Sequence, residues 1–215
     1  MSAGPSRLRV RLHDNFALLL ASLTITFMIT GLEGSRGITV VAGLLNVCSL
    51  LIGFATTDLD MRSPAFLGLV GAGLVGAGIV SIVEVDSTAM ALGATAQAVL
   101  LATLTIAVLG RVIRHTRVTT QTIVGALVVY VLIGQVFAWI YLSLPGYTGE
   151  SVLDPPSDGE LPVYFSYVVL TTVGFGDVTP SGPFSQRLTI VEAVLAQIFI
   201  AVLLARLVSV YSAER

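Results

Sequence analysis

The sequence has few charged residues. Only 11% of its 215 residues are charged, lysine is absent, and the eleven basic residues are all arginine. A soluble domain carries about 25% charged residues, so this chain would lack the polar surface to cover a soluble fold. A single cysteine, Cys48, excludes an intrachain disulfide. The formal net charge of −2 offers no basic surface, so we expect no nucleic-acid partner.

The chain is instead dominated by apolar residues. Hydrophobic residues make up 55% of it, and the mean hydropathy is +0.93. A helix needs about 17–25 apolar residues to cross the roughly 30 Å hydrocarbon core of a membrane. Six runs meet that length: Phe16–Leu32, Ile38–Ala55, Ala65–Val83, Ala89–Leu109, Ile123–Leu144 and Leu188–Val210. We therefore predict an all-α membrane protein with six transmembrane helices.

The arginines predict how these helices are oriented, because cytoplasmic loops carry an excess of basic residues. An inward N-terminus leaves two arginines outside, Arg36 and Arg187. The other nine then lie at the inner side: Arg7, Arg9, Arg11, Arg62, Arg111, Arg114, Arg117, Arg206 and Arg215. We expect a plasma-membrane (inner-membrane) protein with both termini cytoplasmic. A signal peptide over residues 1–32 is the alternative, but no small-residue cleavage motif stands out there.

The spacing of the runs divides the chain near Thr119. The predicted parts are a cytoplasmic N-terminus (1–15), a four-helix transmembrane domain (16–110), a cytoplasmic linker (111–119), a domain of two helices with a long connection (120–211) and a cytoplasmic tail (212–215).

The long connection contains a short apolar segment, Leu161–Leu170, followed by Thr171-Thr172-Val173-Gly174-Phe175-Gly176-Asp177. Leu161–Leu170 has proline near its start and suffices for about three helical turns, too few to span a membrane, so we predict a re-entrant helix. In residues 171–177, the filter segment, we expect positive φ only at the glycines. Alternating backbone handedness would turn successive carbonyl oxygens to one side, where they can replace the hydration shell of a cation.

This pattern resembles the pore module of potassium channels, whose filter sequence is TVGYG, with Phe175 in place of the tyrosine. Residues 120–211 are similar to that module. The whole chain resembles six-helix bacterial potassium channels of the voltage-gated-like superfamily that have no cytoplasmic regulatory domain. Over the first four helices the likeness is architectural only.

The resemblance implies a role for each filter residue. The Thr172 hydroxyl and the carbonyls of Thr172, Val173, Gly174 and Phe175 would bind K⁺, with Gly176 completing the backbone. Thr171 would mark the negative end of the re-entrant helix, and Asp177 would lie at the outer mouth. Because each chain carries one filter, four chains would form a homotetramer. The expected partners are other copies, K⁺ ions and membrane lipids, with K⁺ as the permeant ion and no cofactor.

The filter differs from the common pattern in its aromatic residues. A tyrosine in place of Phe175 would bond to an aromatic residue on the re-entrant helix, and the corresponding position here is Phe165. Both are phenylalanine, so no hydroxyl is left unpaired. Tyr164 retains a hydroxyl that we expect to reach Asp177.

The last helix has no glycine, and Ala196 occupies the position of a hinge glycine in many relatives. A sharp gating bend is therefore not expected there. Glu192 and Gln197 are polar residues at membrane depth, which normally face protein or water. We expect Glu192 to support the back of the re-entrant helix. Gln197 is expected to line the water cavity with the helical face that it shares with Ile200, Ala201, Leu204 and Val208.

Two further motifs have simpler interpretations. Residues 71–76 fit the dinucleotide fingerprint GxGxxG, but they lie within an apolar run, so we interpret them as small residues for close helix packing. Arg111, Arg114 and Arg117 have the spacing of a voltage sensor, yet they follow an uncharged span. We predict weak or absent voltage dependence, with residual sensing as the alternative, and a solvated loop for His115.

Catalytic chemistry has no candidate residues, since no nucleophile–base pair, metal cluster or nucleotide loop is recognisable. We therefore expect a potassium channel and not an enzyme. Two alternatives remain at this stage: a subunit of a potassium uptake transporter, and a non-conducting membrane scaffold.

Overall fold

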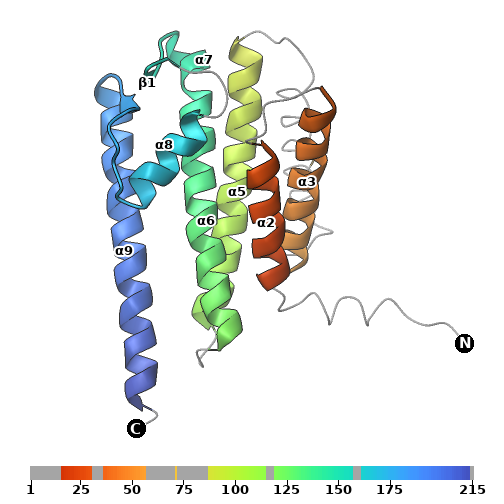
Figure 1. Cartoon of the computed structure of the whole chain (residues 1–215), viewed down its shortest axis with the longest axis vertical. Coiled ribbons are helices and arrows are strands. Elements are labelled where there is room, and N and C mark those ends of the chain that lie inside the picture. Colours follow the sequence, from red (N-terminus) through yellow and green to blue (C-terminus); the bar gives the residue numbers. More distant parts are fainter. Residues whose placement is uncertain are drawn as a thin grey trace, which may run out of the picture. The chain divides into compact units, whose positions relative to one another are not determined.

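The computed structural model describes residues 16–30, 36–56, 71, 87–114, 119–156 and 161–213. Within these residues the helices and strands have the following bounds (Figure 1): α2 (Phe16–Thr30), α3 (Arg36–Ala55), α5 (Ser87–Arg114), α6 (Thr120–Ser143), α7 (Pro145–Thr148), β1 (Leu153–Asp154), α8 (Leu161–Leu170), β2 (Thr179–Pro180) and α9 (Pro183–Ala213). The described chain is mostly helical.

Among the described residues, three helices are long and apolar enough to cross a membrane: Ser87–Arg114, Thr120–Thr148 and Pro183–Arg206. These lengths support an all-α membrane protein. Helices α2 and α3 coincide with the first two predicted spans. The third predicted span, 65–83, lies outside the described residues except for Gly71, which is helical. The count of six spans therefore stays a prediction.

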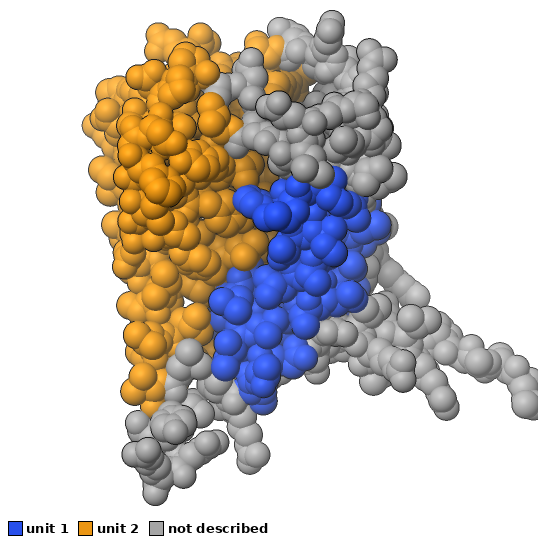
Figure 2. Space-filling view, in the orientation of Figure 1, with its two compact units in different colours: residues 1–67, 103–129 blue, residues 68–102, 130–215 orange. Residues whose placement is uncertain are grey.

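The chain forms two compact units, which are coloured separately in Figure 2. Unit 1 contains residues 1–67 and 103–129, and unit 2 contains residues 68–102 and 130–215. Helices α5 and α6 therefore contribute residues to both units. The filter segment and the helices that precede and follow it belong to unit 2.

Unit 1 is held by close helix packing. A Cβ on Gly53 would lie 2.7 Å from the Leu104 side chain, so glycine permits α3 to approach α5 there. A hydrogen bond of 3.1 Å joins the hydroxyls of Thr26 and Ser49 and satisfies both within the apolar packing. The unit also contains the start of α6. Thr119 caps it by accepting the backbone N–H of Thr122 at 3.3 Å.

Two helices extend beyond the apolar runs from which they were predicted. Helix α5 continues through Arg111 and Arg114, which the sequence analysis assigned to the linker 111–119. Helix α9 begins at Pro183, five residues before Leu188. Gly182 has φ +84° and allows the turn, and proline suits the first helical position. A helix can extend into polar sequence at its ends, so a prediction of helix bounds from hydropathy alone misses those residues.

The core of unit 2 gathers buried side chains around one end of α8. Phe165 of α8 packs with residues of α6, of the segment before α8 and of the segment after the filter: Phe137, Tyr141, Val152, Leu153 and Val178. The rings of Tyr141 and Phe165 meet edge to face, with centroids 5.1 Å apart. This apolar cluster holds α8 against α6.

A two-stranded antiparallel sheet joins the segment before α8 to the segment that follows the filter, with Leu153 opposite Pro180 and Asp154 opposite Thr179. Ser181 extends this pairing. Its N–H donates to the Val152 carbonyl at 2.9 Å, and its hydroxyl donates to the Ser151 carbonyl at 2.6 Å. The sequence analysis did not predict this sheet, because two-residue strands leave no periodic signal.

Candidate functional site

The filter segment begins by capping the C-terminal end of α8. The N–H of Thr172 donates to the Val169 carbonyl at 2.9 Å. The N–H groups of Val173 and Gly174 both donate to the Val168 carbonyl, at 3.1 and 3.4 Å. The last carbonyls of a helix have no partner within the helix. These bonds therefore satisfy the carbonyls at the end of α8 and the N–H groups of the filter segment at the same time. The first half of the filter segment is thereby attached to α8.

The backbone then alternates in handedness. Positive φ occurs at Thr172 (60°), Gly174 (58°) and Gly176 (79°). The alternation expected at the two glycines is present, but the sequence analysis did not expect positive φ at Thr172. A β-branched residue in this region is uncommon, and the left-handed conformation costs about 1–2 kcal/mol. In this conformation the N–H of Thr172 caps the end of α8.

The alternating backbone leaves the carbonyl oxygens of the filter segment available. Among the described residues, none donates a hydrogen bond to the carbonyl oxygen of Thr172, Val173, Gly174 or Phe175. All seven residues of the filter segment are exposed, and a Cβ on Gly174 or Gly176 would meet nothing within 4 Å. The two glycines are therefore required by their backbone conformation and not by close neighbours. Such a row of free carbonyl oxygens can coordinate a cation.

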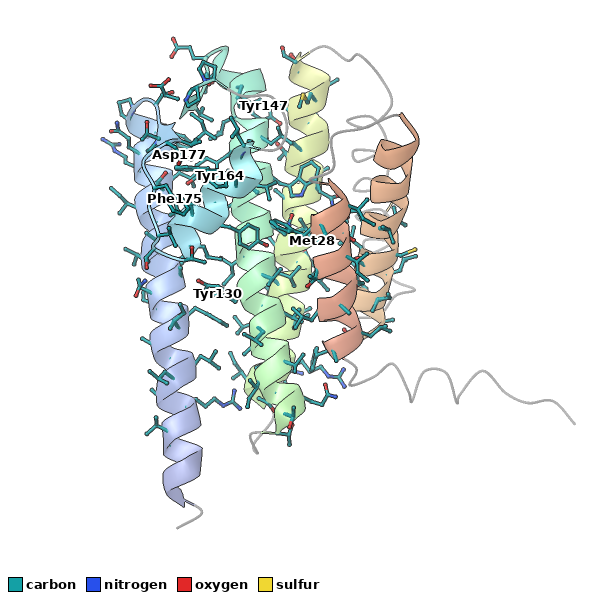
Figure 3. All side chains as sticks on the ribbon, viewed as in Figure 1. Met28, Tyr130, Tyr147, Tyr164, Phe175 and Asp177 are labelled. Atoms are coloured by element: carbon teal, nitrogen blue, oxygen red, sulfur yellow. The ribbon has the colours of Figure 1, made fainter. Side chains whose placement is uncertain are left out.

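The Asp177 end of the segment is ordered by Tyr164 of α8. The Tyr164 hydroxyl donates to Asp177 Oδ2 at 2.6 Å, so the expected contact is present. The Tyr164 ring also stacks on Phe175, with centroids 6.5 Å apart and planes 3° from parallel. Figure 3 shows the three side chains together. The Tyr164 hydrogen bond holds the pKa of Asp177 below its usual range, because it stabilises the ionised carboxylate.

The aromatic pairing differs from the sequence prediction. Within the protomer, Phe175 stacks on Tyr164, whereas Phe165 is buried in the core of unit 2 beside Tyr141. The reason is helical geometry. Adjacent residues on α8 point about 100° apart, so Tyr164 and Phe165 face opposite environments. Spacing along the sequence did not show which of the two faces the filter.

Helix α6 positions the C-terminal end of α8. The Tyr130 hydroxyl donates to the Leu170 carbonyl at 2.9 Å, and the Tyr167 hydroxyl donates to the Val131 carbonyl at 2.7 Å. Tyr130, labelled in Figure 3, also stacks on Phe199 of α9 with centroids 6.1 Å apart. Sequence reasoning missed Tyr130. Its position within an apolar run was the signal that could have identified it, because a tyrosine at membrane depth needs a hydrogen-bond partner for its hydroxyl.

Helix α9 contacts the back of α8 through Glu192. Glu192 is fully buried, and its Oε1 atom lies 2.5 Å from the hydroxyl of Ser166. The hydroxyl of Tyr141 donates to its Oε2 atom at 3.0 Å. Glu192 therefore contacts α8, as the sequence analysis expected. Sequence reasoning did not identify Ser166 and Tyr141 as its partners.

The residues predicted to line a cavity are exposed in the protomer: Gln197, Ile200, Ala201 and Leu204. Ala196, at the predicted hinge position, is fully buried, and α9 is continuous from Pro183 to Ala213. The protomer alone does not distinguish the predicted lining face from its neighbours, because Ile198 is also exposed (54%). The cavity lining stays a prediction.

In unit 1, Arg111 is held at the end of a helix. Its Nη1 atom donates to the carbonyl of Thr56, just after α3, at 2.8 Å. Cations are stabilised at helix C-termini, where the dipole is negative. Arg114 is exposed at the end of α5. Arg117, His115 and residues 72–76 of the glycine motif lie outside the described residues.

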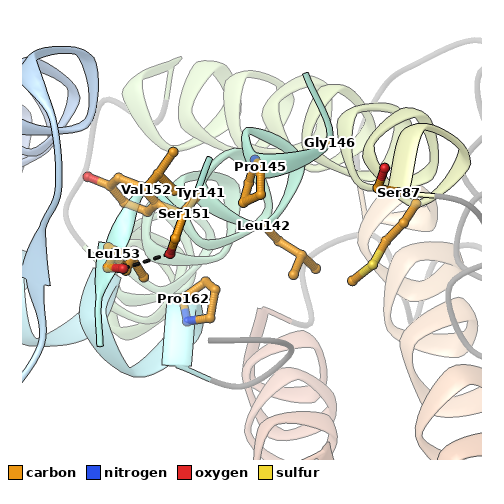
Figure 4. Close-up of a pocket in the computed structure, with 10 residues that line it drawn as sticks. Ser87, Tyr141, Leu142, Pro145, Gly146, Ser151, Val152, Leu153 and Pro162 are labelled. Carbon is orange, nitrogen blue, oxygen red and sulfur yellow. Dashed lines mark hydrogen bonds between the residues drawn. The ribbon is translucent and has the colours of Figure 1, made fainter. Parts of the chain in front are cut away.

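A small pocket of about 110 Å³ lies near the start of α8, between the first turn of α5 and the end of α6 (Figure 4). Pro162, Leu142 and Met90 contribute apolar walls, and Ser87 and Ser151 contribute hydroxyls. The Ser151 hydroxyl donates to the Leu153 carbonyl at 2.7 Å. None of the residues that line this pocket belongs to the filter segment.

Comparison with known proteins matches residues 125–213 to the family model of an ion channel. The match extends from α6 to α9 and includes the filter segment, and it supports an ion channel of the voltage-gated-like superfamily. No curated protein and no solved structure matches the chain.

Proposed function

We propose that this protein is a potassium-selective channel that conducts K⁺ passively as a homotetramer. The observation that carries the proposal is the alternating backbone of the filter segment, with positive φ at Thr172, Gly174 and Gly176 directly after a ten-residue helix. The match to an ion channel family over the same residues supports it.

In the proposed channel, four filter segments surround one axis. The carbonyl oxygens of Thr172, Val173, Gly174 and Phe175 form stacked rings that coordinate dehydrated K⁺, with the Thr172 hydroxyl at the inner end. The negative end of α8 faces the cavity below the filter. The exposure of the filter segment in the protomer is consistent with this arrangement, because the other three chains would cover it.

The pathway below the filter is proposed to be lined by Gln197 and the apolar residues that share its face of α9. A hydrophobic pathway can close by losing its water, which requires no bend in the helix. The continuous α9 helix and the buried Ala196 fit such a gate. The arginine distribution supports a plasma-membrane location with both termini cytoplasmic.

Flux measurements on the purified full chain in liposomes test the proposal. Vesicles loaded with K⁺ and vesicles loaded with Na⁺ are compared under equal gradients, and the oligomer is measured by native mass spectrometry. K⁺ flux well above Na⁺ flux from a tetramer is expected. A folded protein that conducts neither ion would indicate a scaffold, and flux that requires another subunit would indicate part of an uptake transporter.

A further inference from the structure

Behind the filter, three elements meet at a buried polar cluster, the Glu192 cluster, formed by Glu192 of α9, Ser166 of α8 and Tyr141 of α6. All three side chains are fully buried. Ser166 Oγ lies 2.5 Å from Glu192 Oε1 and 2.8 Å from the carbonyl oxygen of Gly134. Tyr141 donates to Glu192 Oε2 at 3.0 Å. Unpaired polar groups at this depth would be costly, so each proton must be assigned.

The protons available around Ser166 do not suffice for an ionised Glu192. A serine hydroxyl carries one proton, whereas an ionised carboxylate and a backbone carbonyl are both acceptors. Ser166 could then donate to Glu192 or to Gly134, but not to both. If Glu192 carries a proton on Oε1, Glu192 donates to Ser166 and Ser166 donates to Gly134. Both short contacts are then satisfied.

The other side of the carboxyl group agrees with this assignment. Thr189 Oγ1 donates to the Ser185 carbonyl at 2.9 Å and lies 3.0 Å from the Tyr141 hydroxyl. Tyr141 donates to Glu192 Oε2, and a neutral Glu192 presents its carbonyl oxygen there as the acceptor. Among the described residues, the titratable groups that face Glu192 are the phenols of Tyr141 and Tyr167. Neither is a cation that would stabilise a buried carboxylate.

We infer that Glu192 is protonated and acts as a positioning residue for the filter, through hydrogen bonds that run from α9 to Ser166 of α8 and on to Gly134 of α6. This inference rests on the proposed channel function. Ser166 lies near the middle of α8, and the Val168 carbonyl half a turn later binds the N–H groups of Val173 and Gly174. A rotation of α8 would therefore move the first half of the filter segment.

Three substitutions test the role of the proton. The E192Q side chain can still donate to Ser166 and accept from Tyr141, so its K⁺/Na⁺ flux ratio should remain within about twofold of wild type. E192L can do neither, and S166A breaks the connection to α8. For these two we expect the flux ratio to fall about five- to tenfold, the equivalent of losing one or two buried hydrogen bonds. Native mass spectrometry checks that each variant remains a tetramer.

Infrared spectroscopy tests the protonation directly. The difference spectrum of wild type minus E192Q at neutral pH should contain the C=O band of a protonated carboxylic acid. E150Q is the matched control, because Glu150 is an exposed glutamate that lies outside the Glu192 cluster. A carboxylate band from Glu192, or an E192Q flux ratio as low as that of E192L, would overturn the inference. If wild type conducts no K⁺, the proposed function fails, while the infrared result still decides the protonation of Glu192.

Discussion

At the residue scale, the filter segment depends on backbone conformation more than on side-chain contacts. Gly174 and Gly176 have positive φ although a Cβ at either position would have free space. Thr172 adopts the same conformation despite its branched side chain. Together these residues direct the carbonyl oxygens, so substitutions here should change ion selectivity before they change the fold.

The substitution G174A tests this directly. A side chain at φ +58° is disfavoured by about 1–2 kcal/mol, and the backbone should relax toward negative φ and redirect its carbonyl. We expect the preference for K⁺ over Na⁺ in the liposome flux assay to be lost. G149A is the matched control, because Gly149 has φ +72° and equally free space but lies outside the filter segment. Unchanged preference for K⁺ in G174A would show that the filter has been wrongly assigned.

The bond between Tyr164 and Asp177 predicts a pH effect. Because Tyr164 lowers the pKa of Asp177, this bond stabilises the folded filter above the ordinary carboxyl pKa, and that stability is lost as pH falls through the lowered value. Y164F removes the hydroxyl, so the pKa of Asp177 should rise. External acid should then inhibit K⁺ flux with a midpoint at higher pH than in wild type.

Y147F is the control for this titration. Tyr147 is also an exposed tyrosine, but its hydroxyl lies 2.9 Å from Thr95 Oγ1 and not beside Asp177. Its acid midpoint should equal that of wild type. An equal midpoint in Y164F would mean that the hydroxyl does not govern the protonation of Asp177.

At the scale of elements, α8 is positioned by close contact with α6. A Cβ on Gly134 would lie 2.9 Å from the Tyr167 ring and 3.3 Å from Leu170, so only glycine lets the helices approach this closely. The Gly134 carbonyl also faces Ser166 of α8. One glycine on α6 thus determines where the filter begins relative to that helix.

G134A should therefore destabilise unit 2 by about 1–3 kcal/mol, the usual cost of overpacking. This loss of stability should be measurable as a lower Tm in detergent and as faster dissociation of the proposed tetramer. G110A is the matched control. Gly110 lies in helix α5 with nothing within 4 Å of its would-be Cβ, so alanine should leave stability unchanged or raise it by up to about 1 kcal/mol. Equal Tm values for the two variants would contradict the packing role of Gly134.

The contact between Arg111 and the end of α3 bears on voltage dependence. A charge moved across the membrane field gains about 2.3 kcal/mol per 100 mV, but Arg111 is bonded to the Thr56 carbonyl, and the stretch of α5 before it is uncharged. Macroscopic currents of wild type should therefore change weakly with voltage, and R111Q should leave that weak dependence unaltered. A steep conductance–voltage curve that R111Q flattens would make Arg111 a gating charge.

At the scale of the whole molecule, the protomer leaves most of α9 exposed. Ile190, Val194 and Leu204 are each at least half exposed, although the helix is long and apolar. In a membrane, lipid, water or other copies of the chain must contact these exposed residues. In the proposed tetramer, contacts between the chains would determine which face of α9 lines the pore.

Cysteine substitutions can identify that face. In a background where Cys48 is replaced by serine, Q197C should react with a small water-soluble thiol reagent added from the cytoplasmic side, and the current should fall. I198C is the matched control, since Ile198 is also exposed in the protomer but lies about 100° around the helix. Equal reaction at both positions, or none at 197 in open channels, would exclude Gln197 from the pore lining.

Local features of this protein were predictable from its sequence. Composition identified the membrane class, and a proline-led apolar segment predicted the ten-residue helix α8. The two glycines predicted the alternating filter backbone, and the hydroxyl that Tyr164 retains beside the filter predicted its contact with Asp177. The positive φ of Thr172 was predicted wrongly, and the stacking of Phe175 on Tyr164 was not predicted. The two-stranded sheet was not predicted at all.

The sequence by itself determined hydropathy, helix starts and glycine conformation, because these depend on neighbouring residues and on the solvent that they prefer. Only the tertiary structure decided which side chains meet behind the filter. Tyr141 and Glu192 are 51 residues apart, Tyr130 and Leu170 are 40 apart, and Ser166 and Glu192 are 26 apart. Such contacts depend on how each helix is rotated and placed against the next. A change of one residue in helical phase, about 100°, exchanges one partner for another.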